Sequence, residues 1–143
     1  MTDIPKLKET ITSFWTTALP ELNRLAVGDA DSEIIETVLE ELVEVAVTGH
    51  DECAIQSWDI VAVKYRDLAE RRKPDIIRWI FEYTDKCDEE SWKYFLGFNF
   101  VLKLNWDDLY VQYIKKYDKF LRIEFDDDYI AFYGLEKYVE QDQ

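Results

Sequence analysis

The side chains with the clearest chemical potential in this chain are carboxylates that recur at helical spacing. Glu33, Glu36, Glu40 and Glu44 follow one another at intervals of three or four residues, so a helix would present all four on one face. Such a row can ligate a metal ion, exchange protons in catalysis or bind a positively charged group. The surrounding residues decide between these three kinds of chemistry.

Metal binding and catalysis are both disfavoured by the rest of the sequence. Carboxylate metal sites in helical bundles combine glutamates with histidines that project into the core. Here the single histidine, His50, follows a glycine at an expected helix end, and the glutamates point away from the apolar face. No nucleophile elbow or phosphate-binding loop surrounds any Ser or Cys. We therefore expect no metal, no cofactor and no enzymatic activity.

Acidic residues also form an uninterrupted block in the first half of the chain. Between Leu25 and Val63 there are ten acidic residues and no Lys or Arg, and residues 1–63 carry −10 of the total net charge of −14. A field of this sign attracts basic proteins and repels nucleic acid and anionic membranes. The block predicts a basic protein partner, and surface solvation is the alternative interpretation.

A second acidic surface is predicted nearer the C-terminus, where two aspartates and then three aspartates stand among tyrosines. Carboxylates beside aromatic rings suit a partner rich in Arg and Lys, and the alternative is that most of these rings fill the core. The predicted partner contacts are therefore Glu33, Glu36, Glu40, Glu41, Glu44, Asp107, Asp108, Asp126, Asp127 and Asp128.

The elements that must position these carboxylates are predicted to be helices. A hydrophobic content of 48% with only 4 Gly and 3 Pro indicates a compact helical protein. The strongest pattern covers residues 31–48, with a broad apolar face opposite the glutamates. Further helices are expected over residues 5–19, 20–28, 51–73, 74–84 and 88–104, and from 105 or 107 to about 117.

The last segment has two alternatives. Residues 120–125 and 129–133 could pair as a β-hairpin, or the three aspartates could cap a helix from Tyr129 to about Glu140, which we favour because everything before it is helical. The predicted fold is all-α, with residues 1–143 as a single helical domain. We expect a bundle or irregular stack of six to eight helices, with a possible short hairpin near 120–133.

The cysteines and the apolar runs bear on the compartment. Cys53 and Cys87 give no disulfide framework, the N-terminus lacks the pattern of a signal peptide, and no apolar run is long enough to span a bilayer. We expect a cytoplasmic protein without membrane or nucleic-acid contacts, with a monomer favoured.

In size, charge and helicity the chain resembles the immunity proteins of bacterial toxin systems, including those of contact-dependent growth inhibition between competing bacteria. The resemblance extends over the whole chain. It implies a protein that binds a cognate toxin domain, often a basic nuclease, and blocks its active site or substrate groove. An acidic secretion chaperone and a nucleic-acid-mimicking inhibitor are the alternatives among binding proteins.

Overall fold

The computed structural model describes residues 2–87 and 91–124. Within these ranges the chain forms α-helices and one π-helical segment and no strand, which confirms the predicted all-α fold. Their bounds are α1 Ile4–Ile11, α2 Trp15–Val27, α3 Ser32–Thr37, α4 Leu39–Thr48, α5 Asp51–Asp59, the π segment η1 Ile60–Lys64, α6 Arg66–Arg71, α7 Lys73–Asp85, α8 Ser91–Leu104 and α9 Asp107–Glu124.

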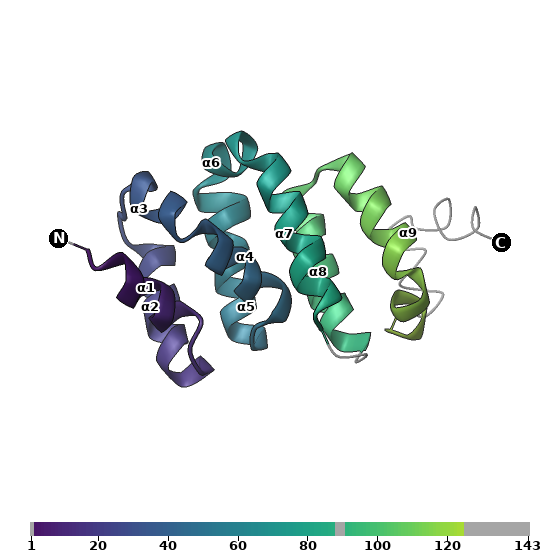
Figure 1. The fold of residues 1–143 in the computed structure, drawn as a ribbon, viewed down its shortest axis with the longest axis horizontal. Coiled ribbons are helices and arrows are strands. Elements are labelled where there is room, and N and C mark those ends of the chain that lie inside the picture. Colours follow the sequence, from purple (N-terminus) through teal and green to yellow (C-terminus); the bar gives the residue numbers. More distant parts are fainter. Residues whose placement is uncertain (1, 88–90, 125–143) are drawn as a thin grey trace.

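The helices are stacked in two rows (Figure 1). One row contains α1, α4 and α7, the other contains α2, α5 and α8, and α9 packs on α8. The short helices α3 and α6 connect successive pairs at the same edge of the stack (Figure 1). Helix pairs that bury their faces mainly against neighbouring pairs form the arrangement of α-solenoids. The fold is thus an irregular stack, one of the two architectures expected.

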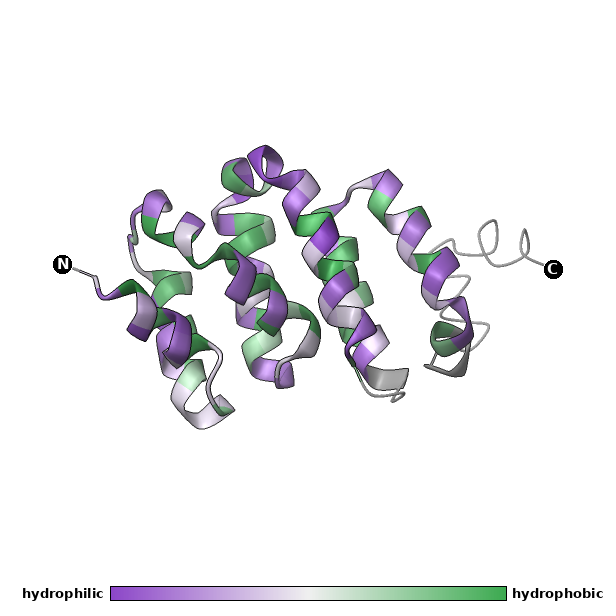
Figure 2. Ribbon diagram, viewed as in Figure 1, coloured by the Kyte–Doolittle hydropathy of each residue, from purple (hydrophilic) through white to green (hydrophobic). Residues whose placement is uncertain are grey.

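Hydrophobic residues lie on the helix faces that meet inside this stack (Figure 2). Burying one large apolar side chain stabilises the fold by about 1.5–3 kcal/mol relative to exposure. The described core draws on most of the elements, and its largest fully buried side chains include Ile11, Leu22, Leu25, Ile35, Leu39, Leu42, Ile60, Ile76, Ile80, Phe98, Phe100 and Tyr113.

The first helix boundary differs from the prediction. We expected a helix to Leu19 and a new one at Pro20, whereas the break lies at residues 12–14 and Pro20 is inside α2. Hydroxyl groups explain the earlier end, since Thr12 donates to the Lys8 carbonyl over 2.8 Å and Ser13 to the Glu9 carbonyl over 2.5 Å. Side chains of this kind compete with the next turn of a helix for its carbonyls.

The helix expected over residues 31–48 is divided at Val38, which has φ −113° and ψ 13°. The Thr37 hydroxyl donates to the Ile34 carbonyl over 2.6 Å, and the Val38 amide donates to the Ile35 carbonyl over 3.1 Å, so the last turn of α3 is tightened. Neither Gly nor Pro marks this break. Consequently the predicted row of glutamates spans two helices of different direction.

The helix expected over residues 51–73 is also divided. It becomes α5, the π segment η1 and α6, with Tyr65 at φ −111° and ψ 42° between the last two. The Lys64 ammonium donates to the carbonyls of Leu25 and Ala26, each over 3.1 Å, and to that of Gly28. The wider turn therefore places a cation against the C-terminal end of α2, where exposed carbonyls favour it.

At the C-terminal side, α9 begins at Asp107, one of the two predicted starts, and continues to Glu124. Residues 120–124 are thus helical and not the first strand of a hairpin. The remaining residues of that alternative, 125–133, and the helix favoured over 129–140 lie outside the described residues. Among the described helices none is long and apolar enough to cross a membrane.

Candidate partner-binding surface

The predicted acidic row of the first half lies on two helices, and we call Glu33, Glu36, Glu40, Glu41 and Glu44 the acidic ridge. The first two side chains belong to α3 and the other three to α4. Because α4 packs between α1 and α7 in its row, residues of those neighbours reach the ridge. This contact was not foreseen from the sequence, which predicted only that the glutamates lie opposite the apolar face.

Three carboxylates of the ridge have partners from other helices. Glu36 lies 3.1 Å from Nη1 of Arg72, Glu41 lies 3.4 Å from Nζ of Lys8, and Glu40 accepts a hydrogen bond from the Tyr83 hydroxyl over 3.1 Å. Their side chains are half-buried, and Oε2 of Glu41 has no hydrogen-bond partner within residues 2–87 and 91–124. Part of the ridge therefore supports the fold.

The two remaining carboxylates of the ridge have no cation within ion-pair distance among the described residues. Glu33 and Glu44 form no ion pair within the described part of the chain. Glu33 is exposed, and Glu44 is half-buried. Burial raises the pKa of Glu44, and the charges of Glu41 and Glu40 raise it further, against a weaker opposing effect of Lys86. These two glutamates are the members of the ridge available to a cation from outside.

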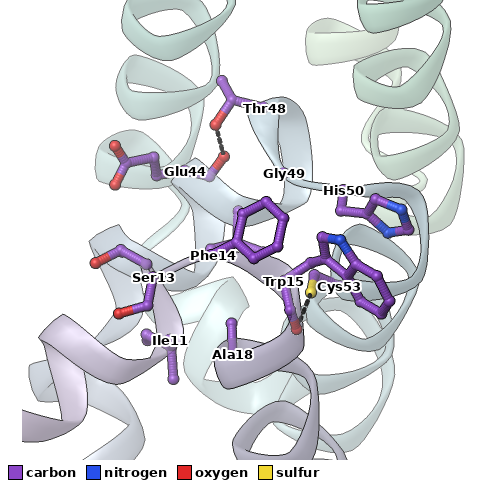
Figure 3. Close-up of a pocket in the computed structure, with 12 residues that line it drawn as sticks. Ile11, Ser13, Phe14, Trp15, Ala18, Glu44, Thr48, Gly49, His50 and Cys53 are labelled. Carbon is purple, nitrogen blue, oxygen red and sulfur yellow. Dashed lines mark hydrogen bonds between the residues drawn. The ribbon is translucent and has the colours of Figure 1, made fainter.

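Glu44 also borders a pocket of about 380 Å³ between the α1–α2 turn and the α4–α5 turn (Figure 3). The pocket brings together turns that are more than thirty residues apart in sequence. Its lining includes Thr12, Ser13, Phe14 and Trp15 from the first turn, and Glu44, Val45, Thr48, Gly49, His50 and Cys53 from α4, the second turn and α5.

Aromatic side chains form one side of this pocket. Phe14 is 73% exposed and Trp15 is 37% exposed. The Trp15 indole stacks on the His50 imidazole, with centroids 4.9 Å apart and planes 17° apart, and the two rings lie side by side in Figure 3. His50 is the N-cap residue of α5, since its Nδ1 accepts from the Glu52 amide over 3.4 Å.

The pocket was missed by sequence reasoning, although a signal was present. Two large aromatic residues, Phe14 and Trp15, follow two hydroxyl residues directly, a sequence typical of a turn that carries exposed rings. The thiol in the pocket is a poor nucleophile, because burial and the charge of Glu52 raise the pKa of Cys53.

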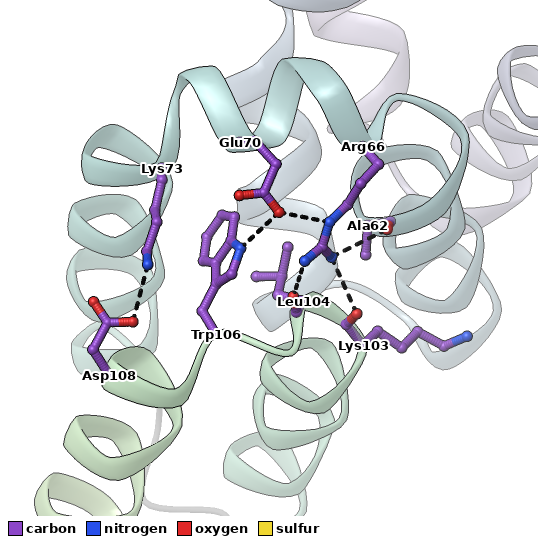
Figure 4. A network of polar contacts seen from close by, with 8 residues as sticks. All are labelled: Ala62, Arg66, Glu70, Lys73, Lys103, Leu104, Trp106 and Asp108. Carbon is purple, nitrogen blue, oxygen red and sulfur yellow. Dashed lines mark hydrogen bonds and ion pairs between the residues drawn. The ribbon is translucent and has the colours of Figure 1, made fainter.

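The second predicted surface begins at α9. Asp107 is exposed in the first turn, whereas Asp108 pairs with Lys73 over 3.1 Å, and this contact lowers the pKa of the Asp108 carboxyl (Figure 4). The Lys73 ammonium also lies 5.3 Å from the centre of the Trp106 ring. Asp126, Asp127 and Asp128 lie outside the described residues, so the structure places only two of the five aspartates.

Next to Asp108, a polar network joins α6 to the end of α8 (Figure 4). Glu70 accepts from Nε of Arg66 over 2.8 Å and from Nε1 of Trp106 over 3.0 Å. The Arg66 guanidinium further donates to the carbonyls of Lys103 and Leu104 at the C-terminal end of α8. Since these groups satisfy one another, the network holds helices together and leaves Asp107 as its exposed neighbour.

Within residues 2–87 and 91–124 no three His, Cys, Asp or Glu side chains are arranged to hold a metal ion. Comparison of the chain with protein-family models, with curated proteins and with solved structures found no match.

Proposed function

We propose that this protein is a non-catalytic binding protein that neutralises a basic protein partner, and that it acts as the immunity protein of a bacterial toxin. The observation that carries the proposal is the charge left on the acidic ridge. Glu33 and Glu44 form no ion pair among the described residues, and the only cations paired with the ridge there, Lys8 and Arg72, come from other helices.

The architecture supports the same function. A stack of helix pairs exposes a long side surface on which side chains from successive pairs stand next to each other. On this surface the ridge of α3 and α4 continues into the pocket beside Phe14 and Trp15. Aromatic groups next to carboxylates that form no ion pair are suited to bind basic proteins.

Co-expression with the product of the neighbouring reading frame tests the proposal. We expect the neighbouring product to arrest growth alone and to be neutralised by this chain, with a complex of defined stoichiometry in light scattering. A Glu33→Lys, Glu44→Lys double variant should bind and protect less well. A partner with an acidic contact surface, or protection that is unchanged in the double variant, would overturn the proposal.

The mass of the free protein in solution distinguishes an immunity protein, which we expect to be a monomer, from an acidic secretion chaperone. An acidic secretion chaperone would be a dimer that holds an extended segment of its client, whereas a stoichiometric inhibitor binds a folded domain. Protection that survives only with an unfolded client segment would favour the chaperone.

A further inference from the structure

We propose that the pocket between the α1–α2 turn and the α4–α5 turn receives one long basic side chain, arginine or lysine, of the protein partner. The inference rests on the proposed function, since it assigns the point of the acidic surface at which a partner is anchored.

The first observation is the exposure of Phe14. A phenylalanine that is 73% exposed leaves most of its apolar surface in water, and burial of that surface would be favourable by roughly 25 cal/mol per Å². Phe14 is the N-cap residue of α2, and its side chain makes no capping hydrogen bond there. Exposed rings beside a pocket are the usual anchors of protein interfaces.

The second observation is the chemical composition of the pocket. Phe14, Trp15 and Val45 supply apolar surface, whereas Glu44 supplies a carboxylate that forms no ion pair within the described ranges. Glu40 and Glu41 stand one turn away on the same helix and add to the negative potential, although Lys8 pairs with Glu41. The site therefore combines an apolar wall with a carboxylate, and the nearby Lys86 offsets the negative potential only weakly.

This combination selects the occupant. An aliphatic side chain would cover Glu44 without replacing its contacts with water, which is unfavourable. A carboxylate or phosphate would be repelled by the ridge. A lysine or arginine places its methylene groups on the aromatic rings and its charge at Glu44, so both parts of the pocket gain a contact. The volume of about 380 Å³ lies at the lower end of the range for small-ligand sites and is sufficient for one long side chain.

The test uses the full chain and acetylated, amidated tripeptides of the form Gly-X-Gly, in which X is arginine, lysine, norleucine or glutamate. Binding is followed by ¹H–¹⁵N NMR at low ionic strength. We expect the arginine and lysine peptides to shift the signals of the two turns, including Phe14 and the Trp15 indole, in a saturable way. The norleucine and glutamate peptides should leave these signals unchanged.

Matched variants separate the pocket from the general charge of the ridge. Glu44→Gln should weaken binding of the arginine peptide about tenfold, the effect of one charge-assisted contact. Glu33→Gln removes the same charge outside the pocket and should change binding less than about twofold. Phe14→Ala should weaken binding several-fold, whereas Val27→Ala, at a residue that is 85% exposed elsewhere, should have no effect.

Three results would overturn the inference. Equal losses in Glu44→Gln and Glu33→Gln would assign binding to the field of the ridge alone. Equal binding of the norleucine peptide would make the pocket a purely apolar groove. A lack of saturable shifts with the basic peptides would mean that no anchoring site exists. None of the three contradicts the proposed function, which fails instead when co-expression yields no complex and no protection.

Discussion

Arg72 and Glu36 form an ion pair in which Nη1 of the guanidinium lies 3.1 Å from Oε1 of the carboxylate. Arg72 precedes α7 and Glu36 belongs to α3, so the pair joins elements that are 36 residues apart in sequence. Nε of the same guanidinium donates to Asp75 over 2.8 Å, and its plane lies over the Trp79 ring. A cation from outside the acidic block therefore holds one end of the acidic ridge.

Replacement of Arg72 by methionine should lower the free energy of unfolding by about 1 kcal/mol, since two ion pairs are lost and the apolar stem is kept. Arg78→Met is the matched control, because Arg78 is more exposed and its contacts with Asp75 and Glu82 are longer, at 3.3 and 3.9 Å. Urea unfolding measures the free energy of unfolding of both variants. Equal losses in the two variants would contradict a structural role of the Arg72–Glu36 pair.

The pair also shows what sequence reasoning could reach. Apolar periodicity was sufficient to place Leu39 and Leu42 in the core and the glutamates opposite them, because the helical period determines which residues share a face. It could not reveal the break at Val38, which arises from local hydrogen bonds of Thr37 and not from Gly or Pro.

Contacts between distant segments were equally out of reach. The partner of Glu36 and the pocket beside Glu44 both depend on how helix pairs stack. A single sequence does not indicate which turns come into contact in the stack. The Phe14–Trp15 turn and the His50 turn lie in separate pairs, and only their packing in the stack creates a site between them. The acidic character of the surface was therefore predictable, whereas its anchoring point was not.

Gly97 offers a test of the packing between α8 and α9. A Cβ atom at this position would lie 2.5 Å from the hydroxyl oxygen of the fully buried Tyr113. Gly97→Ala should therefore lower the free energy of unfolding by about 1–3 kcal/mol. Helix propensity alone predicts the opposite sign, a gain of about 1 kcal/mol. The sign of the change in urea unfolding therefore distinguishes the clash with Tyr113 from helix propensity.

A second variant examines the cause of that loss. Tyr113→Phe removes the hydroxyl group, which donates to the Tyr94 carbonyl over 2.7 Å. In a double-mutant cycle, Gly97→Ala should cost less in the Tyr113→Phe background than in the wild type, because the clashing atom is gone. Strict additivity of the two changes would show that the contact does not determine the cost.

Lys64 should stabilise the C-terminal end of α2 through its contacts with the carbonyls of Leu25, Ala26 and Gly28. Lys64→Met keeps the aliphatic stem and removes the charged donor, and we expect a loss of about 1–2 kcal/mol in urea unfolding. Lys6→Met, at an exposed position of α1, is the control for the loss of one positive charge. A loss of the same size in the control would assign the effect to net charge.

Charge reversal at Glu33 addresses association with the basic partner. Because Glu33 is exposed and forms no ion pair in the described part of the chain, Glu33→Lys should leave the fold intact and slow association several-fold at low salt. The difference from the wild type should shrink as salt rises, since the screening length falls to about 8 Å at physiological ionic strength. Stopped-flow mixing measures the rates.

The control for that reversal is Glu9→Lys, which makes the same change in net charge at an exposed position of α1 outside the ridge. It should slow association less than Glu33→Lys. If the two variants associate at the same rate, the ridge has no special part in steering and acts only through the total charge.

Glu44 should make the stability of the fold depend on pH. Burial, together with the charges of Glu41 and Glu40, raises its pKa above the ordinary value of 4.5. The native state therefore holds this proton more tightly than the unfolded chain, and stability falls as pH rises from about 4.5 through the raised pKa. Glu44→Gln removes this dependence, so the variant should be more stable than the wild type at neutral pH. The advantage should disappear as pH falls below the ordinary glutamate range, which urea midpoints at about pH 7 and pH 4 would measure.

The control is Glu33→Gln, which removes one charge from the exposed part of the ridge. If this variant gains the same stability with the same pH dependence, general repulsion along the ridge is the cause. A gain confined to Glu44→Gln assigns the effect to the burial of Glu44 beside the pocket.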